Sequence, residues 1–154
     1  MANAILIQVE GLEEIKKALS NLAPEIQKKV MDKAVRAQVV DWQKHAQSLA
    51  PVSGKVRVVG RKGRQYVVTP GNLRRNIRVK KLKSPNPTES RYGIVVGKRA
   101  FYWHMVEFGS RNNVRRSFLR NTFDSRAVLA VNNIAGDCAK FIAKYFKAQA
   151  KLKR

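Results

Sequence analysis

The sequence predicts an α+β domain. A small central antiparallel sheet is packed by a long N-terminal helix and a long C-terminal helix, and a basic β-hairpin protrudes. Three observations support this class: apolar residues recur at helical spacing near both ends, β-prone runs occupy the middle, and a glycine-bracketed basic segment separates two valine-rich runs. With 154 residues, the chain is long enough to bury a core. We expect one domain over residues 1–154, with the hairpin inserted at about 54–70.

The first third of the chain is predicted to be mainly helical. Residues 5–9 alternate apolar and other side chains, which indicates a short strand near a sheet edge. Residues 12–19 show helical spacing, with two glutamates in the first turn, where the helix dipole favours acids. Pro24 suits the first position of a second, long helix, and Ala50-Pro51 is expected to end it.

The middle of the chain is predicted to form strands. Residues 54–69 are typical of a hairpin, because two β-prone runs flank Gly60-Arg61-Lys62-Gly63. Residues 73–82 predict an amphipathic strand with a basic, solvated face. Residues 84–87 form a loop by composition, and residues 92–96 are expected to pair with the preceding strand in antiparallel fashion.

The last third is predicted to end in a long helix. Residues 101–108 are aromatic and apolar and end at Gly109, and residues 110–116 form a polar, basic loop. From about Phe118 to Ala150, apolar residues recur near helical spacing, with Gly136 as a weak point inside the helix.

Positive charge is the most unusual property of the composition. The formal net charge is +22, from 32 basic and 10 acidic residues, and no acid lies between Asp41 and Glu89. A solvated surface explains part of this charge, but self-repulsion at this density favours an anionic neighbour, usually nucleic acid. A second basic cluster occupies residues 140–154. The residues that we expect to face DNA or an acidic partner subunit are Lys55, Arg57, Arg61, Lys62, Arg64, Arg74, Arg75, Arg78, Lys80 and Lys81.

Catalytic and metal-binding patterns are weak. His45 is expected to be a surface or partly packed helix residue, and His104 near Glu107 has neither a nucleophile nor an orienting partner in the pattern. Metal-ligand spacing is missing around Cys138 and the two histidines, and residues 60–63 do not have phosphate-loop spacing. We therefore predict no enzyme activity, no cofactor and no metal.

Other compartment signals are few. The single cysteine, Cys138, cannot form an internal disulfide, fits a reducing cytoplasm and is expected to be a buried helix residue. No apolar run reaches the roughly 20 residues that span a bilayer, so no membrane partner is expected. Residues 1–9 lack a basic region and a cleavage-like site, so we expect them to be part of the folded protein.

Three ordered motifs resemble a known family. They are Gly11-Leu12-Glu13-Glu14, then Leu49 to Gly54 followed by Gly71 to Ile77, and finally Tyr102 with Val106-Glu107-Phe108-Gly109-Ser110 ahead of Ser117-Phe118-Leu119-Arg120. In this order they resemble the neck and tail-completion family of lambda-like long-tailed bacteriophages, from about residue 9 to residue 145. Residues 55–70 depart from the family's usual pattern as an insertion, and Ser117 stands where the family tends to have proline.

The resemblance implies a structural virion protein at the head–tail junction, present in the host cytoplasm during assembly. It implies a homo-oligomeric ring around the DNA channel, with head-completion and tail-terminator or tail-tube proteins as partners and non-specific contact with packaged double-stranded DNA. Under this interpretation Phe108 packs in the core and Gly109 permits a turn. Glu107 forms a buried or intersubunit salt bridge with an arginine such as Arg74 or Arg115. The residues expected to be structural or interfacial are Glu107, Phe108, Gly109, Phe118, Leu119 and Arg120.

A second interpretation belongs to a different class: a free, non-specific nucleic-acid-binding protein. The chain has basic strands with aromatic residues nearby, but no recognition-helix, zinc or RNA-binding signature. Either interpretation predicts phosphate contacts that weaken steeply with salt.

Overall fold

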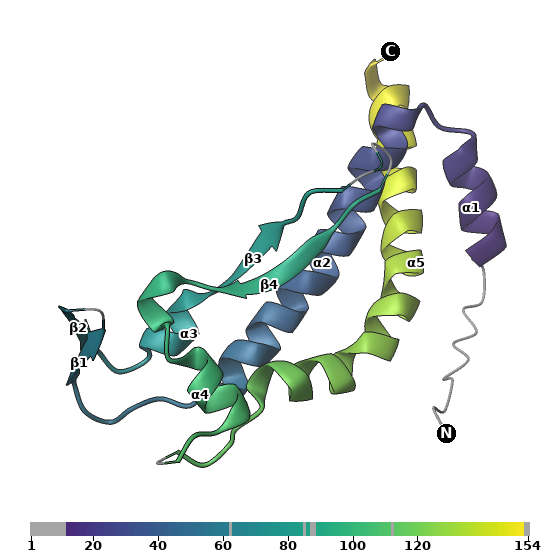
Figure 1. The fold of residues 1–154 in the computed structure, drawn as a ribbon. Coiled ribbons are helices and arrows are strands. Elements are labelled where there is room, and N and C mark those ends of the chain that lie inside the picture. The colour runs from purple at the N-terminus through teal and green to yellow at the C-terminus, as the bar shows by residue number, and fades with distance from the viewer. Residues whose placement is uncertain (1–11, 62, 85, 87–88, 112, 153–154) are drawn as a thin grey trace. The chain divides into compact units, whose positions relative to one another are not determined.

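The computed structural model describes residues 12–61, 63–84, 86, 89–111 and 113–152, and the strand predicted at residues 5–9 lies outside them. The elements are α1 (Leu12–Ser20), α2 (Pro24–Leu49), β1 (Arg57–Arg61), β2 (Arg64–Val68), α3 (Asn72–Asn76), β3 (Ile77–Lys81), β4 (Tyr92–Val96), the 3-10 helix η1 (Lys98–Ala100), α4 (Trp103–Phe108) and α5 (Phe118–Leu152). Along the chain, α1 and α2 precede the strands and α5 follows them, so the predicted α+β class is confirmed (Figure 1).

Two antiparallel strand pairs form separate small sheets. In the hairpin, β1 pairs with β2 from Arg57 opposite Val68 to Arg61 opposite Arg64, so the predicted hairpin is confirmed. In the second sheet β3 lies beside β4 as predicted, and backbone hydrogen bonds from Leu82 to Arg91 and from Gly97 to Asn76 flank the pair.

One predicted strand begins later than expected. The strand expected over residues 73–82 is wrong for its first part, because residues 72–76 form the single-turn helix α3. Gly71 before it has φ 72°, a left-handed conformation that glycine adopts without strain. The Asn76 side chain donates to the carbonyl of Asn72 at 2.7 Å and closes the turn. Five residues are too few for helical spacing to be recognised in the sequence. The alternation of β3 therefore predicts a strand that begins too early.

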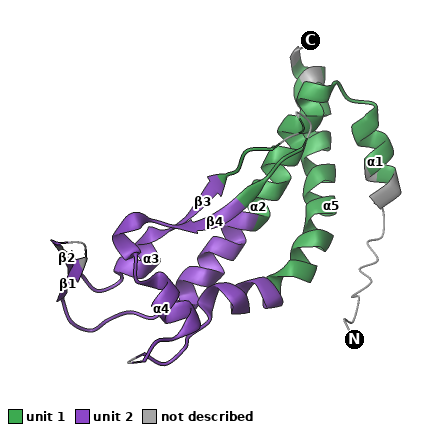
Figure 2. Cartoon of the chain, in the orientation of Figure 1, with its two compact units in different colours: residues 1–38, 81–92, 126–154 green, residues 39–80, 93–125 purple. Residues whose placement is uncertain are grey.

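The described chain divides into two compact units (Figure 2). Unit 1 contains residues 1–38, 81–92 and 126–154, and unit 2 contains residues 39–80 and 93–125. The prediction of a single domain is not decided by this division, since α2 and α5 each run through both units.

Unit 1 is built mainly on helices. Its core joins residues of α2, such as Val30 and Ala34, to Cys138 and Ile142 of α5. Cys138 is buried as predicted, and its thiol contacts the sulfur of Met31 at 3.7 Å. Burial raises the pKa of this thiol, and the charge of Asp137 adds to the effect.

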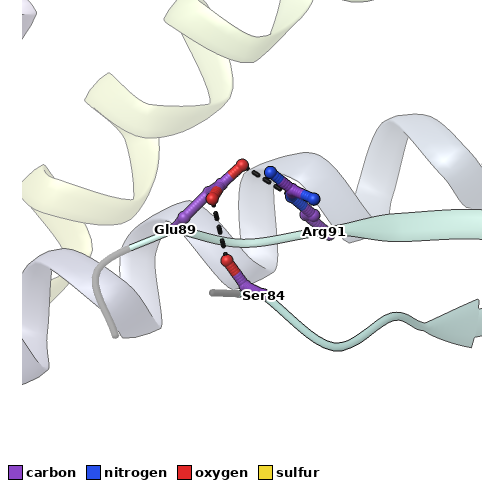
Figure 3. A network of polar contacts seen from close by, with 3 residues as sticks. All are labelled: Ser84, Glu89 and Arg91. Carbon is purple, nitrogen blue, oxygen red and sulfur yellow. Dashed lines mark hydrogen bonds and ion pairs between the residues drawn. The ribbon is translucent and has the colours of Figure 1, made fainter. Parts of the chain in front are cut away.

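The connection after β3 in unit 1 is held by a small polar network (Figure 3). The Ser84 hydroxyl donates to one Glu89 carboxylate oxygen at 2.9 Å, and the Arg91 guanidinium donates to the other at 2.6 Å. The Arg91 hydrogen bond, followed by that of Ser84, holds the pKa of Glu89 below its ordinary value. Three side chains thus fix the end of the loop that leads into β4.

Unit 2 contains the hairpin and most of β3 and β4, and it has its own core. Ala46 and Ala50 of α2 pack with Leu73 of α3, Ile77 of β3 and Phe118 of α5. The alanines permit close approach of α2, and Phe118 fills the centre with 1 % of its surface exposed. This core places the predicted site residues around it.

Candidate assembly interface

The guanidinium groups of Arg74 and Arg75, both in α3, donate hydrogen bonds to neutral oxygens. The Arg74 guanidinium donates to the carbonyl of Ala50 at 2.8 Å and to that of Ser48 at 3.2 Å. Arg75 donates to the Thr69 hydroxyl at 2.6 Å. A cation at the C-terminus of α2 is stabilised by the helix dipole, so Arg74 helps to end the helix. Both side chains nevertheless remain exposed, and each keeps a full positive charge.

The cations of β3 fall into two groups. Arg78 and Lys80 are exposed on one side of the strand, while Ile77 is buried, as the predicted basic face requires. Lys81 pairs with Asp32 of α2, and its ammonium lies 5.6 Å from the centre of the Tyr92 ring. Arg78 and Lys80 are therefore better placed than Lys81 for contact with an external anion.

The predicted cations of the hairpin fall in two places along the sequence, before or at the start of β1 and around the turn between β1 and β2. Lys55 precedes β1, and Arg57 begins it; both side chains are exposed. At the other end the backbones of Arg61 and Arg64 pair with each other, and Lys62 between them lies outside the described residues. The hairpin is anchored by Val68, which is buried, and by Tyr66, whose ring centre lies 5.5 Å from that of Phe101.

Glu107 caps the final helix. Its side chain is 4 % exposed, and its two carboxylate oxygens accept the backbone N–H groups of Leu119 and Arg120, both at 2.9 Å. These two donors lie in the first turn of α5, where N–H groups have no partner within the helix and the dipole favours an anion.

Within the described chain, Glu107 pairs with neither Arg74 nor Arg115, and the intersubunit form of the predicted salt bridge stays a prediction. Arg74 binds the carbonyls at the end of α2, and Arg115 donates to the Ser117 hydroxyl at 2.7 Å. Ser117, at the proline position of the family pattern, donates in turn to the Glu107 carbonyl. Leu119 and Arg120, predicted as structural or interfacial, therefore contribute their backbones to this cap.

Phe108 does not pack in the core, contrary to expectation, because 68 % of its surface is exposed. Successive residues of a helix point about 100° apart, so α4 cannot bury both Glu107 and Phe108 on one narrow face. Gly109 has φ 83° and makes the predicted turn after α4. Val114, in the loop between α4 and α5, is also apolar and is 85 % exposed.

A groove of about 600 Å³ opens in unit 2. Its apolar lining includes Val52, Val59, Met105 and Val114, and two arginines, Arg57 and Arg116, contribute positive charge. Among the described residues that line it, none is acidic. Of the groove residues named above, only Arg57 was predicted from the sequence to face a partner. Val114, an apolar residue inside the basic loop 110–116, was the one sequence feature that could have indicated the groove.

Unit 2 contains many more basic than acidic residues. The unit contains sixteen of the 32 basic residues, but its acids are only Asp41, Glu107 and Asp124. Glu107 is buried, and both of its carboxylate oxygens accept backbone N–H groups of α5. Unit 2 therefore has a strongly cationic surface as well as an apolar groove.

Titratable groups elsewhere are not grouped for chemistry. The His45 ring lies 3.2 Å from the Thr122 hydroxyl, and His104 is exposed beside Trp103. No group of three or more histidine, cysteine or acidic side chains that could hold a metal occurs in the described ranges. Over the same part of the chain, no helix is sufficiently long and apolar to cross a membrane.

An exposed cationic face, an apolar groove and internally engaged polar groups define a protein built for contact with other macromolecules. Residues 13–109 match the family described as "Bacteriophage HK97-gp10, putative tail-component". The match covers more than half of the chain, and the chain belongs to this family. It is a structural tail component of a bacteriophage, as the motifs predicted. Comparisons with curated proteins and with solved structures gave no match.

Proposed function

We propose that this chain forms an oligomeric ring at the head–tail junction of a long-tailed phage, around the channel through which DNA passes. The observation that carries the proposal is the cationic surface of unit 2 in a member of a tail-component family. A ring repeats each basic side chain in every copy. Confined DNA would then meet many phosphate contacts without any reading of sequence.

In this arrangement Arg78 and Lys80 of β3 and the hairpin cations are the candidates for the channel or for an acidic neighbouring ring. Arg78 and Lys80 are exposed, and Lys55 and Arg57 extend the same charge type to the base of the hairpin. Contacts of this kind carry no sequence information and allow a protein to slide along DNA, so the ring would permit DNA to pass.

The proposed partners are further copies of this chain, head-completion proteins on one side and tail-terminator or tail-tube proteins on the other. The exposed apolar residues Met105, Phe108 and Val114 suit a protein rather than a nucleic-acid contact. Protein contacts and DNA contacts are thus assigned to different side chains of unit 2.

Deletion of the gene from its parent phage tests the placement. Electron microscopy of the resulting particles should show full heads and tails that are separate or aberrant. Joined, infectious virions from the deletion would contradict a role at the junction.

The role of the hairpin tip has a separate test. Replacement of Arg61, Lys62 and Arg64 with serine should lower assembly or DNA retention, because the tip loses three charges. A normal infectious titre from this variant would contradict any contact between the tip and DNA or an acidic ring.

Net charge alone also fits a free nucleic-acid-binding protein. Retardation of duplex DNA at low salt would occur in either case, because any chain this basic binds phosphate. Tight binding that persists at physiological salt would favour the free protein, and closed rings seen by electron microscopy would favour the junction.

A further inference from the structure

The groove of unit 2 combines apolar side chains with two arginines. Its volume of about 600 Å³ falls within the range of about 300–1,000 Å³ that is usual for ligand sites. Val52 and Val59 lie along its lining with Met105 and Val114, and Val114 is 85 % exposed. Arg57 and Arg116 are the charged groups of this lining. An apolar segment with an adjacent carboxylate would match both features.

This chain contains one stretch of that chemistry. Residues 1–15 have no lysine or arginine, but they include Glu10, Glu13 and Glu14, three of the ten acids. Apolar residues crowd the same stretch, most densely over residues 4–9. No other stretch of fifteen residues combines such a run of apolar side chains with an excess of acid.

Most of the remaining acids already have partners inside the chain. Asp32 pairs with Lys81, Glu89 with Arg91, and Asp137 with Gln38 and Lys140. Glu107 is held by the first turn of α5. By composition, the N-terminal stretch is therefore the part of the chain that best matches a groove with apolar residues and two arginines.

We infer that the groove of unit 2 binds the N-terminal segment of a neighbouring copy, with the apolar side chains of residues 4–9 against its valines and Glu10 near Arg57 or Arg116. The inference rests on the proposed ring, which supplies the neighbour. Copies that each carry a net charge of +22 repel one another, so an attractive contact between opposite charges would be needed to bring them together.

A cross-link between two different chains tests this contact. One full-length chain carries Ile7→Cys and the other carries Val114→Cys, both with Cys138→Ala so that only the new thiols react. The two are mixed under assembly conditions and treated with a short bismaleimide. Because neither chain has both thiols, a product that joins position 7 to position 114 can arise only between copies.

The expected result is a mixed dimer on a denaturing gel, with the joined peptides identified by mass spectrometry. Asn132→Cys, at an exposed position of α5 outside the groove, is the matched control for Val114→Cys and should give at least about tenfold less product. Arg57→Glu with Arg116→Glu should lower the yield by a similar factor, provided that circular dichroism shows an unchanged fold.

No mixed product above the Asn132 control, or a yield insensitive to the two arginines, would overturn the inference. Electron microscopy of the same samples separates the two proposals. Closed rings without the cross-link would leave the ring intact and remove the docking of the N-terminal segment. Absence of both rings and cross-link would count against both, whereas the specific cross-link supports the docking in either case.

Discussion

The two units of this chain use their charge in different ways. In unit 1, ion pairs join Asp32 to Lys81, Glu89 to Arg91 and Asp137 to Lys140. In unit 2, arginines instead bind neutral oxygens, as Arg74 does at the end of α2 and Arg75 does at Thr69.

A cation bound to a carbonyl oxygen keeps its full charge toward a third group, whereas a cation paired with a carboxylate is largely neutralised at a distance. Net charge therefore does not identify the functional surface. The difference between the units indicates that unit 2 retains its ability to bind anions, and that part of the charge of unit 1 supports the fold.

The largest effect on stability is expected in the core of unit 2. Phe118→Ala should lower the free energy of unfolding by about 3–5 kcal/mol, because it opens a cavity at a residue that is 1 % exposed. Urea unfolding measures the change, and Phe108→Ala is the matched control, with an expected change within about 0.5 kcal/mol. Equal losses from both variants would contradict the assignment of Phe108 to the surface.

The next largest effect on stability is expected at Glu107, whose carboxylate caps the first turn of α5. Glu107→Ala should cost about 2–3 kcal/mol, because two N–H groups in the first turn of α5 lose their acceptor. Glu107→Gln retains one side-chain oxygen as an acceptor and should lose less. If Glu107 instead served an external partner, both variants would unfold like wild type and fail only in assembly.

A smaller, pH-dependent effect is expected for the Asp32–Lys81 pair of unit 1. Burial raises the pKa of Asp32, but Lys81, Ser90 and the charge of Lys28 together outweigh it, so this pKa lies below the ordinary 3.8. The pair therefore stabilises the fold above pH 3.8, and that contribution is lost as the pH falls through the lowered pKa.

Asp32→Asn tests this sign. In urea unfolding, the variant should be less stable than wild type near neutral pH and should approach it in acid. A stability difference that grows as the pH falls would contradict the direction of the shift.

The smallest effect on stability, and the sharpest on DNA binding, is expected at β3. Arg78→Ser with Lys80→Ser should leave the free energy of unfolding within about 0.5 kcal/mol of wild type, since both side chains are exposed. It should also reduce the slope of the logarithm of DNA affinity against the logarithm of salt concentration by about 1.8, at about 0.9 per lost phosphate contact. An unchanged slope would remove these residues from the DNA-binding surface.

Much of the fold could be predicted from local patterns. Pro24 and Ala50-Pro51 set the expected limits of α2 within one residue, and helical spacing gave α5 to within two residues of its observed end. Alternation located β3 and β4 as well as the hairpin. These patterns succeed because each element is long enough to show its own period.

The site was harder to predict because its features depend on contacts distant in sequence. Glu107 is visible in the sequence as an acid among cations, but its partners are N–H groups twelve and thirteen residues later, and backbone donors leave no sequence signal. Phe108 appears apolar and therefore internal, yet the short α4 turns it away from Glu107. The groove joins the loop at Val52 to Val114, residues that no local pattern connects.

We expect assembly to depend on the uncompensated charge of unit 2 and not on charge in general. A gene-deleted phage is complemented with Lys55→Ser, Arg78→Ser and Lys80→Ser together, or with a matched unit 1 variant that carries Lys140→Ser, Lys144→Ser and Lys147→Ser. Both remove three charges from exposed positions. The unit 2 variant should lower the infectious titre by about tenfold or more, because phosphate contacts contribute steeply to affinity. The unit 1 variant should stay near wild type, and equal titres from the two, or a lower titre from the unit 1 variant, would contradict the claim.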